Sequence, residues 1–285
     1  MSEEQARLVR VERHEQGYVA EIVLDRPEAL NSVSTAMALA IAGACAEVGA
    51  DPGVRAVVLT STHPKVFCAG ADLKERNSLT DAQLLAQRPV ARAAYRSVLD
   101  LPVPAIAAVD GIALGGGFEL ALSCDLIVAA ESGLVGLPEV RVGVIPAGGG
   151  TQLLTRRVGW SRAASMIFTA RRLPAPEAHA LGVVDEIVPD GTARDRALQI
   201  AAEIAGNSPV GVRNAKRSMR LGFDVDLATG LEVEDACWRA TAFSPDRAEG
   251  VAAFNEKRPP RWPSSLRASC CATGCRRASA RSCVR

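Results

Sequence analysis

Two glutamates in glycine-rich surroundings are the residues best suited to chemistry in this chain. Glu119 lies in Leu114-Gly-Gly-Gly-Phe-Glu-Leu120, and Glu139 lies twenty positions further on in Leu137-Pro-Glu-Val140. Two carboxylates that act on one water need unequal proton occupancy or unequal environments, because like charges held close together do not both ionise freely. The pair predicts acid–base chemistry, with one group protonated and the other ionised.

The glycines before Glu119 predict a place where backbone meets ligand. Without side chains they allow close approach, and the N-terminus of the helix that follows adds unpaired N–H groups. Glu119 comes three residues after Gly116, so the two share one helix face. The same run also fits a helix start packed tightly on a sheet. It matches neither the dinucleotide nor the P-loop glycine spacing.

Two further segments complete the candidate site. Ala69, Gly70 and Ala71 follow a predicted buried strand, and their small side chains let this loop present N–H groups as well, although such turns are often structural. Two loops of this kind can hold one carbonyl oxygen between them. The apolar neighbours of Glu139 predict a raised pKa, which suits a general acid. The alternative for Glu139 is a surface ion pair with Arg141.

The periodicity of the hydrophobic residues and the positions of the turn residues predict an α/β chain. The expected strands are 8–11, 18–24, 54–60, 104–109, 126–130 and 183–188. The expected helices are 31–48, 80–100 with an interruption at Pro89, 116–124, 151–171, 192–206, 209–221, 226–242 and 245–257. We predict an α/β core over 1–195, a helical region over 196–263 and a disordered tail over 264–285.

Composition narrows the class of protein. Of the 285 residues 48% are hydrophobic and only 4% are aromatic, which argues against base stacking on nucleic acid. The net charge of +1 depends on five arginines in 264–285, and without this tail the body is mildly acidic. The charged N-terminus and the lack of long apolar runs predict a cytoplasmic protein without a membrane span.

The cysteines fall into two groups. Four lie in the tail, at 270, 271, 275 and 283, where their spacing allows a metal or redox cluster but includes neither a CxxC pair nor a histidine. We interpret the tail instead as an extension of no catalytic importance. The other four are expected to be buried, reduced thiols, at 45, 68, 124 and 237.

Over residues 8–262 the chain resembles the enoyl-CoA hydratase/isomerase (crotonase) family. The resemblance rests on the order and spacing of several segments rather than on any one of them. They are Leu24-Asp-Arg-Pro-Glu-Ala-Leu-Asn31, Cys68-Ala-Gly-Ala-Asp-Leu-Lys74, Asp110-Gly-Ile-Ala-Leu-Gly-Gly-Gly-Phe-Glu119, Pro138-Glu139, Gly143-Val-Ile-Pro146, Gly149-Gly-Thr-Gln152 and Ala253-Phe-Asn-Glu-Lys257.

The resemblance implies an α/β crotonase-like spiral of ββα units with a helical C-terminal region that forms a homo-trimer or hexamer. It implies that the N–H groups of Ala71 and Gly116 form the oxyanion hole and that Glu119 and Glu139 are the catalytic pair. The substrate-binding residues it implies are Ala69, Ala71, Asp72, Leu73, Lys74, Gly116 and Lys257. No metal or redox cofactor is implied, since coenzyme A belongs to the substrate.

The activity implied is hydration of a trans-2-enoyl-CoA to a 3-hydroxyacyl-CoA, as in fatty acid β-oxidation. Two alternatives stay open: a Δ3,Δ2-enoyl-CoA isomerase, and a non-catalytic relative that binds acyl-CoA or RNA. A Ser/His hydrolase is disfavoured because no G-x-S-x-G motif is present. Two departures from the family pattern, Ala147 and Glu28, are expected to affect the water site and CoA affinity respectively.

Overall fold

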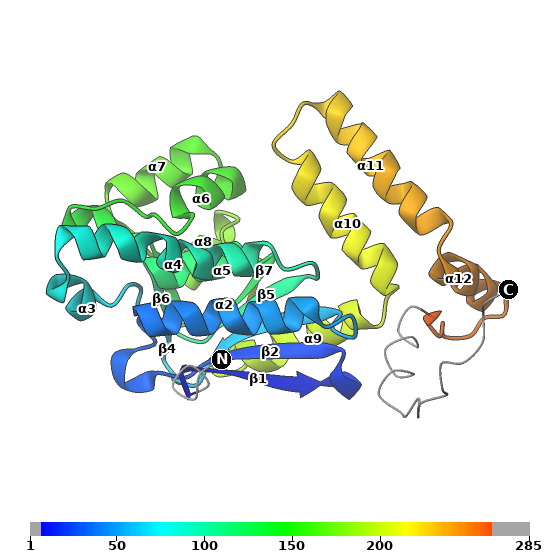
Figure 1. Cartoon of the computed structure of the whole chain (residues 1–285), viewed down its shortest axis with the longest axis horizontal. Coiled ribbons are helices and arrows are strands. Elements are labelled where there is room, and N and C mark those ends of the chain that lie inside the picture. The colour runs from blue at the N-terminus through cyan, green and yellow to red at the C-terminus, as the bar shows by residue number, and fades with distance from the viewer. Residues whose placement is uncertain (1–6, 264–285) are drawn as a thin grey trace, which may run out of the picture. The chain divides into compact units, whose positions relative to one another are not determined.

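A computed structural model describes residues 7–263 (Figure 1). The chain divides into two compact units, Met1–Gly206 and Asn207–Arg285. The predicted disorder of the tail and its four cysteines lie outside the described residues. None of the described helices is both long enough and apolar enough to cross a membrane.

A six-stranded sheet forms the frame of the first unit, in the order β1-β2-β3-β5-β7-β10. The hairpin predicted at the N-terminus is confirmed, since β1 and β2 pair antiparallel, and the other strands run parallel. The strands are β1 (Val9–His14), β2 (Val19–Leu24), β3 (Ala56–Ser61), β5 (Ala105–Val109), β7 (Leu126–Ala130) and β10 (Glu186–Val188).

Alternate residues of these strands build two apolar layers, one on each face of the sheet. Val57 and Leu59 pack in the layer that includes helix α2 (Thr35–Ala50), whose N-cap is Ser34. Ala56 and Val58 pack in the layer that includes helix α9 (Ala193–Ala205). A strand covered on both faces needs a continuous apolar run, which is why segment 54–60 lacks polar alternation.

Short strands of a second sheet follow the strands of the first. This sheet has the order β4-β6-β8-β9 and comprises β4 (Val66–Cys68), β6 (Ile112–Leu114), β8 (Leu134–Gly136) and β9 (Arg172–Pro174). Along the chain β3 leads to β4, β5 to β6 and β7 to β8, and helices follow each pair. This repetition is the predicted spiral of ββα units.

The helices of the first unit differ from the prediction in two places. Helix α4 (Asp81–Leu99) runs through Pro89, so the interruption predicted there is wrong. The turn before Pro89 is exposed, and water can satisfy the carbonyl that loses its donor. The single helix predicted over 151–171 is α6 (Gly150–Val158) followed by α7 (Trp160–Phe168), because Gly159 adopts φ +81° between them. The other elements of this unit are η1 (Glu15–Gly17), η2 (Pro27–Ala29), α3 (Leu73–Ser78), α5 (Gly116–Ser123), η3 (Glu139–Val142) and α8 (Ala175–Ala180).

The second unit consists of helices α10 (Pro209–Gly222), α11 (Leu227–Ala242) and α12 (Pro245–Asn255). Ser208, Asp226 and Ser244 cap their N-termini with side-chain oxygens. The division between the units follows Gly206, directly after the end of α9. Helix α9 belongs to the first unit because its alanines pack on the sheet: Ala193, Ala197, Ala201 and Ala205.

Candidate active site

Glu119 projects from the first turn of α5 and is held by a glycine loop. Its side chain is buried, with 3% of the residue exposed. Oε1 accepts hydrogen bonds from the backbone N–H groups of Gly148 and Gly150, at 2.6 and 2.8 Å. Among the described residues Oε2 has no hydrogen-bond partner. Glu119 thus has one oxygen fixed by the protein and one available to a ligand.

Burial and hydrogen-bond donors have opposite effects on the pKa of Glu119. Burial raises the pKa of Glu119, while the N–H groups of Gly150 and Gly148 and the charges of Arg88 and Arg76 act in the opposite direction. Hydrogen bonds donated to a carboxylate favour its ionised form. The two backbone donors therefore favour Glu119 as the ionised member of the pair.

Glu139 begins η3, where the chain leaves β8, and its carboxylate has no such support. Both of its oxygens are buried, and neither has a hydrogen-bond partner among the described residues. Burial raises the pKa of Glu139 to about 7, and the charge of Glu119 adds to this rise. Glu139 makes no ion pair with Arg141 within the described residues, so the alternative of a surface pair is not what the structure shows.

The carboxylate of Glu139 lies against the glycine turn that opens α5. A Cβ atom placed on Gly115 would lie 3.2 Å from Oε1 of Glu139. Both glutamates therefore reach the start of α5, Glu119 from within the helix and Glu139 from η3. The structure brings together the two carboxylates that the sequence placed twenty positions apart.

Ala71 and Gly116 also meet at this point. A Cβ atom on Gly116 would lie 3.5 Å from the Ala71 nitrogen, and one on Gly70 would lie 3.3 Å from the Gly116 nitrogen. The bridge between Ala71 and Val33 uses the carbonyl of Gly70 and the N–H of Asp72, so the Ala71 N–H faces the opposite side. Gly116 is the first residue of α5, where N–H groups lack an acceptor within the helix.

The other predicted binding residues take several positions. The Ala69 N–H donates to the carbonyl of Leu30. The Asp72 carboxylate caps α3 and accepts a hydrogen bond from Arg26 at 2.8 Å, so its role is structural. Leu73 and Lys74 are exposed on α3. Lys257 lies in the second unit, just after α12, and its predicted contact with CoA stays a prediction.

Tyr95 is a site residue that the sequence did not point to. It comes from α4 and is 5% exposed. Its ring carbons lie 2.8 Å from where a Cβ of Gly148 would be, and its hydroxyl would clash with a Cβ on Gly116. Tyr95 therefore lies between the loop that holds Glu119 and the N–H pair. No signal in the sequence pointed to Tyr95, because its place at the site depends on how α4 packs. Arg88, seven residues earlier on α4, donates to the carbonyl of Ala147 at 2.5 Å.

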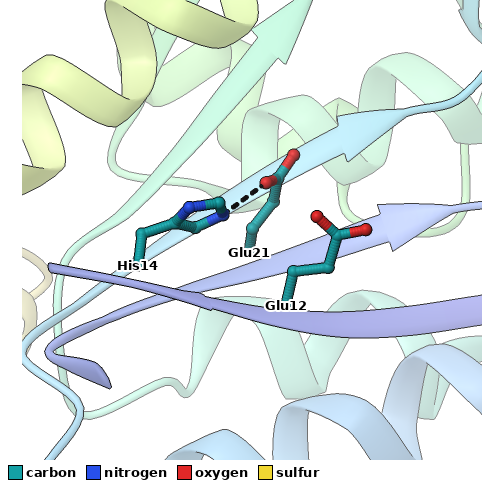
Figure 2. Close-up of side chains that lie close together, drawn as sticks. All are labelled: Glu12, His14 and Glu21. Carbon is teal, nitrogen blue, oxygen red and sulfur yellow. Dashed lines mark hydrogen bonds and ion pairs between the residues drawn. The ribbon is translucent and has the colours of Figure 1, made fainter. Parts of the chain in front are cut away.

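A second cluster of titratable side chains lies on β1 and β2 (Figure 2). Glu12, His14 and Glu21 form the one group of three potential metal ligands found among residues 7–263. Glu12 and Glu21 are opposite each other in the β1–β2 register. His14 Nε2 lies 2.7 Å from Glu21 Oε2.

The Glu12–His14–Glu21 cluster already contains its counter-charge. Arg194 donates to both oxygens of Glu21, from Nε and Nη2 at 2.7 Å each, and Thr60 donates to Oε1 at 2.7 Å. This bidentate pair lowers the pKa of Glu21 against the effect of its burial. A guanidinium held on the carboxylate would repel a metal ion, so we interpret the cluster as a structural ion-pair network.

Comparisons with known proteins identify the family of the chain. The sequence model of the family "Enoyl-CoA hydratase/isomerase" matches residues 14–265. Human mitochondrial methylglutaconyl-CoA hydratase is 41% identical over 265 residues, which cover 92% of this chain and 78% of that protein. The bovine mitochondrial enoyl-CoA hydratase domain-containing protein 2 is 42% identical over 250 residues, with 86% and 84% covered. The crystal structure of an enoyl-CoA hydratase from Bacillus anthracis has a TM-score of 0.88 and 40% identity, and the match covers 90% of this chain and 99% of that one.

The chain belongs to the enoyl-CoA hydratase/isomerase (crotonase) family. Its fold is the α/β crotonase fold with two sheets and C-terminal helices, as the resemblance predicted. It is an enzyme of the hydro-lyase type with enoyl-CoA hydratase-type activity. The four cysteines predicted to be buried, reduced thiols, Cys45, Cys68, Cys124 and Cys237, are free and buried.

Proposed function

We propose that this enzyme hydrates a trans-2-enoyl-CoA to a 3-hydroxyacyl-CoA, with Glu119 and Glu139 as the catalytic pair. The observation that carries the proposal is the unequal support of the two carboxylates. Glu119 accepts two backbone hydrogen bonds, whereas Glu139 accepts none from the described residues and has a pKa of about 7. One group is suited to taking a proton and the other to giving one at neutral pH.

The N–H groups of Ala71 and Gly116 would bind the thioester oxygen. As water attacks, electron density moves from the C2–C3 double bond toward this oxygen, and two donors held in place stabilise the charge that develops. Removal of one donor from a comparable oxyanion hole costs about 3 to 4 kcal/mol of transition-state stabilisation. Backbone donors suit the task because the two loops already fix their positions.

Proton transfer then follows the protonation states of the pair. The water oxygen forms a bond to C3 as the ionised Glu119 carboxylate takes a proton from that water. The protonated Glu139 gives its proton to C2, which completes the new C–H bond. Glu119 ends the step protonated and Glu139 ionised, and a proton exchange between them or with solvent restores the starting state.

The proposal is tested by following the loss of the enoyl thioester absorbance of crotonyl-CoA with wild type, Glu119→Gln and Glu139→Gln. Glu12→Gln is the matched control, since Glu12 is a glutamate of the other cluster. We expect turnover in wild type and control and a large loss in both site variants. Near-normal turnover in Glu139→Gln would contradict the assignment. Turnover of a 3-enoyl-CoA in preference to the 2-enoyl isomer would favour an isomerase instead.

We also propose that the chain acts as a homo-trimer or hexamer through its second unit. Large apolar side chains of this unit are exposed in the single chain, among them Phe243 at 85% and Phe254 at 84%. Exposed apolar surface of this extent is typical of an interaction site. Light scattering after gel filtration would test this, and a monomer at micromolar concentration would contradict it.

A further inference from the structure

Two polar groups at the active site have no partner and no part in the proposed hydration. The first is the hydroxyl of Tyr95, which lies beside Gly116 and has no hydrogen bond to any described residue. A buried tyrosine hydroxyl normally finds a partner. Tyr95 is 5% exposed, and its hydroxyl lies 2.4 Å from where a Cβ of Gly116 would be, so the oxygen is available to a ligand held by the oxyanion pair.

The second group is the guanidinium of Arg76. Asp72, the residue after Ala71, is the N-cap of helix α3. The Arg76 N–H donates to the carbonyl of Asp72, so Arg76 lies one helical turn beyond the loop that contains Ala71. Arg76 is half-buried, and its side chain forms no hydrogen bond or ion pair within residues 7–263. Its charge nevertheless acts on Tyr95, Glu119 and Glu139, and opposes the rise of the pKa of each.

Arg26 and Arg88, two other arginines near the site, differ from Arg76 because their guanidinium groups donate hydrogen bonds to the protein. Arg26 is bound by the carboxylate of Asp72 at 2.8 Å, and Arg88 donates to the carbonyl of Ala147 at 2.5 Å. A half-buried guanidinium that no protein group accepts from is available to a ligand, and a planar carboxylate is the acceptor that matches its donors best. A neutral acyl chain would leave Arg76 unpaired.

We propose that Arg76, assisted by the Tyr95 hydroxyl, binds a carboxylate at the end of the acyl chain, so that the preferred substrate is an enoyl-CoA with a second carboxylate. This inference rests on the proposed hydration and adds its substrate class. A substrate carboxylate also brings a further negative charge close to Glu119 and Glu139, and it is tolerated there only if a cation accompanies it. Arg76 supplies that cation from the helix next to the oxyanion loop.

The test compares glutaconyl-CoA, which ends in a carboxylate, with trans-2-hexenoyl-CoA, a neutral substrate of similar length. Wild type, Arg76→Met, Arg76→Lys and Tyr95→Phe are assayed on both, and the exposed Arg92→Gln on α4 is the matched control. We expect wild type to prefer glutaconyl-CoA. We expect Arg76→Met to lower kcat/KM for it by about 10- to 100-fold, mainly through KM, and to leave KM for hexenoyl-CoA within about twofold, whereas a change in kcat through the glutamates would be shared by both substrates.

The conservative variants refine the result. Arg76→Lys should keep part of the preference because it keeps the charge without the planar fork, and Tyr95→Phe should lose less than Arg76→Met. An equal loss on both substrates in Arg76→Met, with a shifted pH profile, would overturn the inference, since Arg76 would then serve the glutamates alone. A wild type that prefers hexenoyl-CoA would overturn it while leaving hydration intact. Failure of wild type to hydrate either substrate would overturn the proposed function itself.

Calorimetry provides a readout that does not depend on turnover. Glutaryl-CoA and hexanoyl-CoA are saturated and cannot be hydrated, so their Kd values report binding of the acyl end alone. We expect wild type to bind glutaryl-CoA more tightly, and Arg76→Met to abolish the difference. Equal Kd values for both ligands in wild type would contradict the proposed carboxylate subsite.

Discussion

The first unit contains two regions with buried glutamate carboxylates, and the two regions differ in how many hydrogen bonds these carboxylates accept. Glu21 is fully buried and accepts hydrogen bonds from Thr60 and Arg194, with His14 2.7 Å away. Glu139 has buried oxygens with no hydrogen-bond partner among the described residues. The pKa is lowered for Glu21 and raised to about 7 for Glu139. A carboxylate with all its acceptors occupied stabilises the fold, whereas one left without donors can exchange a proton with a ligand.

The largest effect that would test this contrast is on turnover. Glu139→Gln keeps the shape of the side chain but removes the proposed proton donor, and general acid catalysis is typically worth about 100- to 10,000-fold. We expect kcat for crotonyl-CoA to fall by this amount, with the urea midpoint of unfolding at pH 7 no lower than in wild type. Glu21→Gln is the converse control, since it should leave kcat nearly unchanged at 25 °C. A loss of kcat in Glu21→Gln as large as in Glu139→Gln would remove the distinction between the regions.

The next effect is on stability, and it depends on which partner is removed. Arg194→Met would leave Glu21 charged and fully buried without its counter-ion, whereas Glu21→Gln would leave Arg194 44% exposed and able to meet water. Removing one partner of a buried ion pair, so that the other charge stays buried without a counter-ion, lowers the free energy of unfolding by about 3 to 5 kcal/mol. We expect the lower end of this range because Arg194 is partly exposed. Urea denaturation measures this free energy of unfolding. The double variant Arg194→Met/Glu21→Gln removes the buried charge as well. If it is no more stable than Arg194→Met alone, the uncompensated charge of Glu21 is not the cause of the lost stability.

The residues of the candidate site were more predictable from the sequence than their surroundings. Glu119, Glu139, Ala71 and Gly116 occur within short segments whose composition indicates their use, and the structure places them together. Family motifs gave the order of these segments. Proximity follows from the parallel strands, whose ends bring loops far apart in sequence to one edge.

The parts that could not be predicted depend on distant contacts. The strands of the second sheet, such as β4 and β6, span three residues each, too short for a periodic pattern. The Glu21 network joins positions 173 residues apart, since Arg194 lies on α9. Tyr95 reads as a core residue of α4, and only the packing of that helix against α5 gives its hydroxyl a place at the site.

The pH dependence should have opposite signs in the two regions. A raised pKa means that native Glu139 keeps a proton that the unfolded chain has released, so its contribution to stability is present below about 4.5 and is lost as pH rises toward about 7. The lowered pKa of Glu21 gives a contribution that is present above about 4.5 and is lost as pH falls through the native pKa. We therefore expect Glu139→Gln to gain stability relative to wild type between pH 5 and pH 8, measured by urea midpoints.

The same protonation sets the pH profile of turnover. Because the proposed hydration needs protonated Glu139, kcat should fall on the alkaline side with an apparent pKa near 7, and the limb should be absent from the residual activity of Glu139→Gln. Glu21→Gln should keep the limb. An unchanged alkaline limb in Glu139→Gln would assign it to another group.

The smallest effect isolates one donor of the Glu21 network. Thr60→Val keeps the shape of a fully enclosed side chain on β3 but removes the hydroxyl that donates to Oε1 of Glu21 at 2.7 Å. Arg194 would still neutralise the carboxylate, so only one hydrogen bond to a charged group is lost, about 1.5 to 3 kcal/mol. Thr62→Val is the matched control, since its hydroxyl donates to Asp25 in an exposed pair and should cost much less. Equal costs for the two variants would mean that burial does not strengthen the hydrogen bond to Glu21, and the contrast with Glu139 would then rest on Arg194 alone.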